Sequence, residues 1–168
     1  MPSQDVQVGG QVNNFAEALL TKRAGDGAFV QNDPVMYTLN LGTLQQGEPS
    51  ALAELGVIND VLAPADDLNG TWSIMAADFN VSGFNPISDM ATSSTMSGLS
   101  VEIETVMLGS FAGTIVLHPV GTNAGGFSGA LPDVSIHLLG NIVPVPEPAS
   151  FVLMLLGLVC VQMRRCRS

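Results

Sequence analysis

The chain has 168 residues, of which 46% are hydrophobic and 12% are charged, and its formal net charge is −10. This length suits one domain and a tail, and so much apolar content with so little charge argues against disorder. Between Ala24 and Met163 there is no Lys or Arg, yet 13 of the 15 acidic residues fall there. So acidic a segment repels phosphate backbones, which argues against nucleic acid as a partner.

The N-terminal region gives conflicting signals. Residues 1–11 are polar and lack the basic start and apolar run of a secretory signal peptide. Further on, Asn14 with Glu17, and Lys22 before Gly25, resemble the two capped ends of a helix. A helix this short is only marginally stable without packing. Helix and strand both remain open here on these signals alone.

After Gly27 the hydrophobic pattern becomes that of β-strands. Val35–Leu41 alternates apolar and polar residues, and the clearest alternation places Leu99, Val101, Ile103 and Thr105 opposite Ser100, Glu102, Glu104 and Val106. Further strands are expected at Ala51–Ile58, Thr71–Met75, Gly113–Leu117 and Val134–Leu139. Six or seven short strands separated by turn residues predict an all-β sandwich. Both cysteines, Cys160 and Cys166, lie in the tail, so we expect it to fold without disulfides.

Two groups of residues are candidates for a metal site. His118 and His137 lie on neighbouring predicted strands and, with Asp133, have side chains suited to a metal. Asp60, Asp66 and Asp67 offer loop oxygens for Ca²⁺. There is no EF-hand pattern, and exposed or solvated polar residues explain both groups as well. We therefore predict no bound metal and no cofactor.

No motif for catalysis is present. Ser128 lies in the turn Gly126-Phe-Ser-Gly129 and not in a nucleophile elbow, and the glycines lack the strand–helix context of a nucleotide-binding loop. The sequence therefore predicts a protein that is not an enzyme, with no catalytic residues. A hydrolase too divergent to show its motif remains an alternative.

The C-terminal tail has three predicted parts. Residues 142–150 form a proline-rich spacer, because each Pro fixes φ and restricts the residue before it. Residues 151–163 are almost unbroken in apolar character and predict one short transmembrane helix of about 20 Å, against a hydrocarbon core of about 30 Å. Residues 164–168 carry three arginines, which place this end in the cytoplasm and the β domain on the other side of the inner membrane.

These parts, in this order at the C-terminus, resemble the PEP-CTERM sorting signal of Gram-negative bacteria. The resemblance covers about 25 residues and implies a sorting motif at Val145, Pro146, Glu147 and Pro148 and a membrane stop at Arg164, Arg165 and Arg167. In that family the membrane protease-transpeptidase exosortase is thought to recognise the motif and process the tail. Exosortase is therefore an expected partner, and proteins so sorted are often linked to extracellular polysaccharide.

Residues 7–141 resemble the choice-of-anchor D group of surface domains. The resemblance rests on Tyr37-Thr-Leu-Asn-Leu-Gly-Thr43, Gln46-Gly47, Ala63-Pro-Ala-Asp66 and Gly121-Thr-Asn-Ala-Gly-Gly126. It implies an immunoglobulin-like β-sandwich over residues 1–141, with an early strand at Asn13–Leu20. Such domains often occur in several copies on interchangeable anchors, so we expect the β domain to be N-terminally incomplete.

The expected protein is an exported structural module of the cell surface or extracellular matrix. It is tethered as a single-pass membrane protein with the β domain periplasmic or external, and becomes a cell-surface or extracellular protein after exosortase processing. The alternative is an adhesin-like module that recognises glycan or protein.

Overall fold

The computed structural model describes residues 12–146, in which eleven strands and no helix are found. Their bounds are β1 (Ala18–Gly25), β2 (Ala28–Asp33), β3 (Met36–Gln45), β4 (Ala51–Asn59), β5 (Asp67–Met75), β6 (Asn80–Ser82), β7 (Ile87–Met90), β8 (Thr95–Ile103), β9 (Gly109–Thr122), β10 (Ser128–Ala130) and β11 (Val134–Val143). Among the described residues, no helix is long and apolar enough to cross a membrane.

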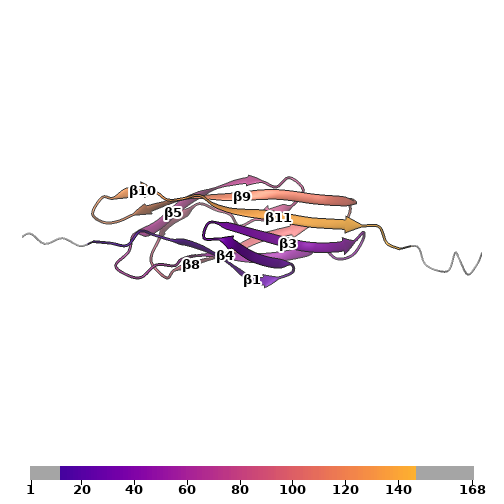
Figure 1. Cartoon of the computed structure of the whole chain (residues 1–168), viewed down its shortest axis with the longest axis horizontal. Helices are drawn as coiled ribbons and strands as arrows, with labels where there is room; N and C mark the ends of the chain where they lie inside the picture. The colour runs from indigo at the N-terminus through magenta and orange to yellow at the C-terminus, as the bar shows by residue number, and fades with distance from the viewer. Residues whose placement is uncertain (1–11, 147–168) are drawn as a thin grey trace, which may run out of the picture.

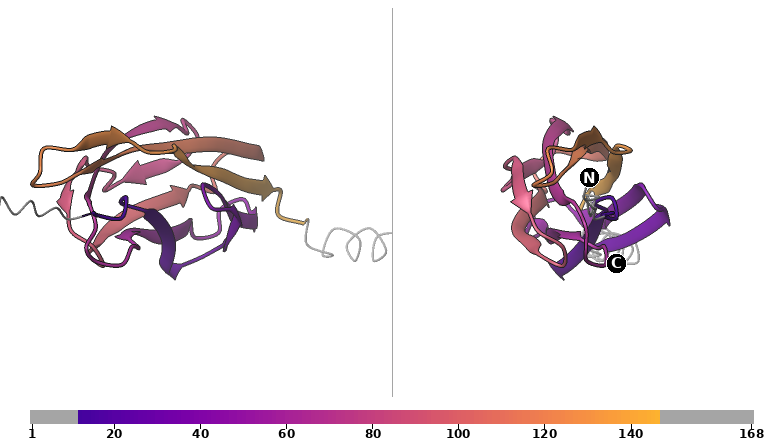
Figure 2. Two further views of the ribbon diagram at one scale, coloured as in Figure 1. Left: turned by 60° about the vertical axis from the view of Figure 1, so that its left-hand side comes forward. Right: turned by 90° about the vertical axis from the view of Figure 1, so that its left-hand side faces the viewer.

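The strands form two sheets that enclose one core (Figures 1 and 2). The four-stranded sheet has the order β1-β4-β8-β6, and the seven-stranded sheet has the order β2-β3-β11-β9-β5-β7, with β10 also paired to β9. All pairs of strands are antiparallel except β3 with β11, which run parallel with Ile136 beside Tyr37 and Val143 beside Gln45. The prediction of an all-β sandwich is therefore confirmed.

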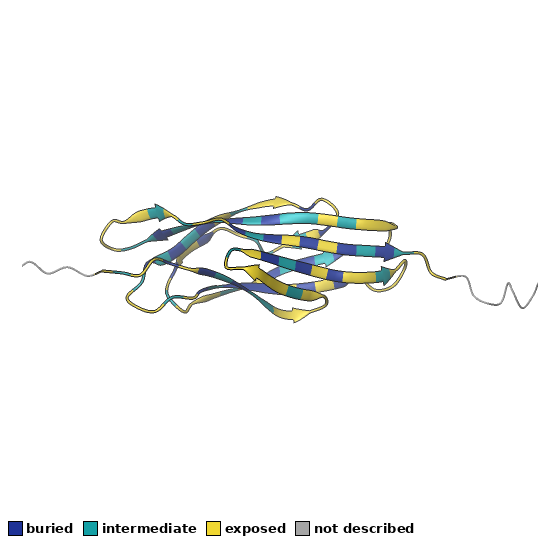
Figure 3. Ribbon diagram, viewed as in Figure 1, coloured by how far each residue is buried: buried dark blue, intermediate teal, exposed yellow. Residues whose placement is uncertain are grey.

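Alternation along the strands separates core from solvent, as Figure 3 shows for β3 and β11. Tyr37, Leu39 and Leu41 of β3 are buried, as the Val35–Leu41 pattern predicts. On β8, Leu99, Val101 and Ile103 are at most 1% exposed. A sheet with one face on a core requires this period of two.

Within the segment with conflicting signals, Ala18–Gly25 forms strand β1, and Asn14 before it makes only an isolated bridge to Ala65. The helical alternative for Val12–Gly25 is therefore wrong, and the strand expected at Asn13–Leu20 begins later, at Ala18. Ala16, Ala18 and Leu20 are buried while the residues between them are more exposed, which is the period of a strand. The residues that resemble helix caps have long-range partners instead: the Asn14 side chain donates to the Leu62 carbonyl over 2.8 Å.

The expected C-terminal end of that helix is a turn between the sheets. Lys22 donates through Nζ to the carbonyls of Gly25 and Gly27 over 2.7 and 2.8 Å. Gly25 has φ of 81°, and an added Cβ would lie 2.1 Å from the Leu52 carbonyl oxygen, so only glycine fits this position.

Two stretches whose sequence is rich in turn residues also contain strand residues. β5 begins at Asp67, inside the stretch 64–70 whose composition is typical of a turn. The glycine-rich region 121–132 contains β10, which folds back on β9 with Gly129 opposite Gly121.

The sandwich is elongated, and the described chain enters at one end and leaves at the opposite end (Figure 1). We call the end where β11 finishes the tail end; it also carries the loops β3–β4, β5–β6 and β8–β9. The opposite end, with the loops β4–β5 and β9–β10, is the far end. The predicted sorting residues Glu147 and Pro148, the transmembrane helix 151–163 and the stop residues Arg164, Arg165 and Arg167 lie outside the described residues.

Candidate functional site

The chain leaves the sandwich directly from a central strand. β11 lies between β3 and β9 and pairs with them as far as Val143 and Ile142, respectively. The next three residues, Pro144, Val145 and Pro146, are exposed and belong to no strand. Proline has no backbone N–H, so this segment cannot extend the ladder.

The exit is fixed by the turn after β3. The backbone N–H of Gln46 donates to the Val143 carbonyl over 2.9 Å, and that of Gly47 donates to the Thr105 carbonyl over 3.1 Å. The Gln46 side chain also donates to the Val106 carbonyl over 2.8 Å. One turn therefore connects the end of β11 to the β8–β9 loop.

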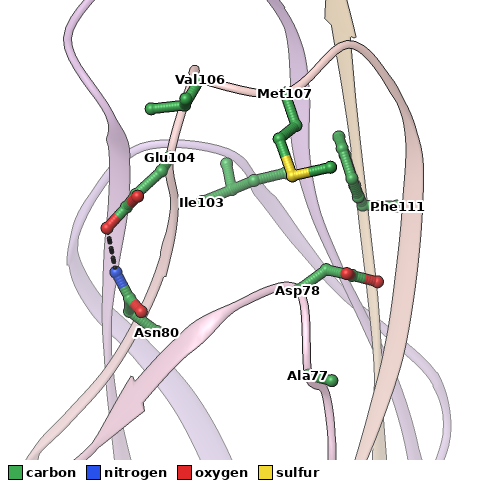
Figure 4. Close-up of a pocket in the computed structure, with 8 residues that line it drawn as sticks. All are labelled: Ala77, Asp78, Asn80, Ile103, Glu104, Val106, Met107 and Phe111. Atoms are coloured by element: carbon green, nitrogen blue, oxygen red, sulfur yellow. Dashed lines mark hydrogen bonds between the residues drawn. The ribbon is translucent and has the colours of Figure 1, made fainter.

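A cavity of about 270 Å³ opens at the tail end. Figure 4 shows Met107 lying across it toward Phe111, with Ile103 behind and Asp78 below. Asn80 donates to Glu104 over 2.8 Å at one side. The cavity is therefore apolar on one wall and acidic on its rim.

A buried polar network closes the far end. Asn59 is 0% exposed; its side chain donates to the carbonyls of Asp66 and Met90 over 3.1 and 3.0 Å and accepts from the Glu17 N–H over 3.1 Å. Asp66, itself 2% exposed, accepts through Oδ1 from the amides of Asn13 and Asn123 over 3.2 and 2.8 Å. Burial without such partners is costly for polar groups, so this network fixes the far-end loops.

In this network Asp66 has a different role from the Ca²⁺ ligand that the sequence suggested. Its carboxylate accepts amide donors in the interior, while Asp60 is exposed and Asp67 is partly buried at the start of β5. No group of three or more His, Cys, Asp or Glu suited to a metal is found between residues 12 and 146.

Of the three residues in the histidine hypothesis, the structure brings together His118 and Asp133 but not His137. His118 Nδ1 and Asp133 Oδ1 lie 2.9 Å apart. His137 pairs instead with Thr114, four residues from His118 along β9, which puts it about 13 Å away at about 3.3 Å per residue. The structure therefore does not bring the two histidines together.

Sequence reasoning missed the second partner of His118. Ser73 Oγ lies 2.9 Å from His118 Nε2, so Ser73 of β5, His118 of β9 and Asp133, the residue before β11, form one hydrogen-bonded chain. Its order is that of nucleophile, base and acid in serine hydrolases. However, the side chains of His118 and Asp133 are 43% and 60% exposed, and none of the three residues lines the cavity of Figure 4 or three other cavities of the described region. Acyl transfer relies on hydrogen-bond donors in a water-excluded site, whereas these three side chains lie on an exposed face. Only the pairing register of β5 and β9 joins Ser73 to His118, so no local sequence signal would have found it.

Ser128, the loop serine of the sequence, begins β10 opposite Thr122. It is exposed, and no catalytic partner reaches it among the hydrogen bonds found for the described residues.

The chain is similar to several solved structures, and the first of them supports the sandwich fold. An ASH/PapD-like domain of human CEP192 (PapD-like domain 7) is similar at 12% identity and a TM-score of 0.50, over 86% of this chain and 96% of that one. Two further structures are the VesB protease of Vibrio cholerae (20% identity, TM-score 0.43, covering 62% of this chain and 30% of that one) and a cohesin module from a Clostridium perfringens family 33 glycoside hydrolase (13%, 0.38, 71% and 98%). No curated protein matches the chain.

The tail is where the sequence itself matches a known family model. The model of the PEP-CTERM protein-sorting motif matches residues 144–167, which begin directly after the last residue of β11. The chain thus carries a PEP-CTERM sorting motif behind a β-sandwich that is similar in fold to a PapD-like domain.

Proposed function

We propose that this protein is an exported surface module, held at the inner membrane by its tail and then released from it by exosortase. One observation carries the proposal: β11 ends at Val143 and the sorting motif begins at residue 144. Removal of the tail at any point in 144–167 leaves all eleven strands intact. The folded domain therefore need not open for processing.

The position of β11 supports a structural role. A load applied to the tail acts on the central pairs β11–β3 and β11–β9 and not on an edge strand. These ladders extend over most of β11, so such a load is shared by many hydrogen bonds. The domain benefits from this arrangement for as long as its C-terminus is tethered, before exosortase releases it.

The proposed setting is the cell surface or the extracellular matrix, in contact with extracellular polysaccharide. An acidic domain whose residues 12–146 contain no cysteine fits a hydrated matrix, and the open placement of Ser73 favours a non-enzymatic role. The finer assignments, an immunoglobulin-like domain of the choice-of-anchor D group from a Gram-negative bacterium, rest on the sequence resemblances.

A second candidate function is adhesion through the far end. Phe15 is 65% exposed and packs against Phe127, with ring centroids 5.7 Å apart. Leu62, in the β4–β5 loop at the same end, is 83% exposed. Exposed aromatic rings with amides beside them are suited to binding sugars or protein side chains. A glycan array with the processed protein, compared with its Phe15→Ser variant, tests this function. Signals that Phe15→Ser abolishes would favour adhesion over a purely structural role.

The experiment for the main proposal replaces Pro146, Glu147 and Pro148 together by Ala in a host with a matching exosortase. We expect the variant to stay in the membrane fraction at full length, while the unchanged protein reaches the surface in shortened form. Pro144→Ala is the matched control, because it removes a proline of the same segment and leaves Pro146, Glu147 and Pro148 in place. Equal processing of the triple variant and the unchanged protein would contradict the proposal.

A further inference from the structure

Four exposed apolar side chains lie together at the tail end. Val106, Met107 and Leu108 of the β8–β9 loop are 68%, 70% and 50% exposed, and Val145 of the exit segment is 56% exposed. We call these four residues the tip surface. Single exposed apolar residues are common, but a run of three beside a fourth indicates a contact surface.

The tip surface is held in place by the fold. Gly109, which follows the loop, pairs with Ile142, three residues before Val145. The Gln46 side chain donates a hydrogen bond to the Val106 carbonyl, and the Gln46 backbone N–H donates one to the Val143 carbonyl. The loop and the exit segment therefore face their surroundings as one unit, with the adaptable Met107 over the cavity of Figure 4.

The length of the tail indicates what lies next to this surface. Residues 147–150 separate the described chain from the apolar run that starts at Phe151. Five steps of about 3.6 Å, from Pro146 to Phe151, span at most about 18 Å. When the apolar run is in a bilayer, as the proposed function requires, the tip surface is held close to the lipid headgroups.

We propose that the tip surface docks into the outer-facing headgroup layer of the membrane that holds the tail. This inference rests on the proposed tethering. Docking is shallow, because acidic residues flank the apolar ones: Glu48, Asp78 and Glu104 are exposed at the same end. Neutral headgroups accommodate these carboxylates, whereas anionic lipids repel them.

The test uses the full chain reconstituted in phosphatidylcholine vesicles, with Cys160 and Cys166 replaced by Ser. Met107→Cys places a bimane label on the tip surface, and Leu62→Cys places the same label at the far end on an apolar site that is also exposed, 83% against 70%. With brominated lipids we expect fluorescence at position 107 to fall about twofold, since interfacial side chains lie about 5–10 Å deep, and at position 62 to stay unchanged. Half-replacement by phosphatidylglycerol at low salt is expected to weaken the quenching at 107, and added salt to restore it.

Flotation of the same vesicles separates the two claims. Floating protein with equal, negligible quenching at positions 107 and 62 would overturn the docking and leave the tether standing. Protein that does not float would overturn both. The label at position 107 could instead be shielded from water without being quenched by brominated lipid. If that shielding falls when the protein is diluted with more lipid, copies of the chain are in contact with one another, and this result would also overturn lipid docking.

Discussion

The loops at the two ends of the sandwich are held in place by different interactions. Loops at the far end are closed by buried hydrogen bonds around Asn59 and Asp66. Loops at the tail end are connected through the Gln46-Gly47 turn and leave Val106, Met107 and Leu108 exposed. The far end is therefore expected to be sensitive to polar substitutions, whereas the tail end has exposed residues that stability does not require.

The largest expected effect breaks the far-end network. Asn59→Ala leaves the Glu17 N–H and the carbonyls of Asp66 and Met90 without their partner. Buried groups left unsatisfied cost about 1–3 kcal/mol each, so we expect the free energy of unfolding to fall by about 3 kcal/mol or more. Urea unfolding of the processed protein measures this.

Asn32→Ala is the matched control for Asn59→Ala. Asn32 makes an exposed side-chain hydrogen bond to Thr38 over 2.7 Å, so its loss is expected to change stability by about 0.5 kcal/mol at most. Equal losses for the two variants would show that the buried network does not stabilise the far end.

A smaller effect depends on pH and concerns Tyr37, a buried residue of β3. Burial raises the pKa of Tyr37 above its usual 10.0, nearby Glu17 and Asp33 add to this, and hydrogen bonds from the Leu20 backbone and Gln31 oppose it. Because the folded state holds this proton more tightly, its contribution to stability is complete below pH 10 and is lost as the pH rises through the folded-state pKa. As the pH rises above 10, the free energy of unfolding of the Tyr37→Phe variant should therefore fall less than that of the unchanged protein.

Tyr37 is the only tyrosine, so tyrosinate absorbance reports its pKa directly. Titration of the folded protein should give a midpoint above that of the protein in urea. A midpoint at or below the urea value would contradict the raised pKa.

The smallest effect concerns the tail end. Met107→Ser alters an exposed residue, so we expect the free energy of unfolding to change by about 0.5 kcal/mol or less. Differential scanning calorimetry of this variant and the unchanged protein measures the difference. A loss of several kcal/mol would mean that Met107 covers Ile103 and Phe111 as part of the core, and would weaken the distinction between the two ends.

Local pattern predicted the strands that have one clean buried face. The alternation of Val35–Leu41 and of Leu99–Ile103 corresponds to β3 and β8, because one face of each packs on the core. β2 gave no such signal, since almost all of its residues are exposed at the sheet edge. Asn14 and Glu17 resemble the capping residues of a helix, but their hydrogen-bond partners lie more than 40 residues away, so no local pattern could show that they do not cap one.

Long-range pairing was beyond the reach of sequence patterns. The parallel pairing of β3 with β11 joins Met36 to Ser135, and no local residue pattern specifies it. The meeting of Ser73 with His118 depends in the same way on the register of β5 and β9. In the tail, by contrast, fixed spacing along the chain carries the motif, so the sequence alone predicted the PEP-CTERM match at residues 144–167.

The central claim is that the folded domain ends where the sorting signal begins. Intact-mass spectrometry of the protein from the surface fraction of a host with a matching exosortase tests it most directly. We expect a species that retains β11 through Val143 and lacks Arg164, Arg165 and Arg167, with a new C-terminus in the proline-rich spacer or just after it. A surface species that ends at Ser168 would contradict the account and favour a permanent single-span anchor.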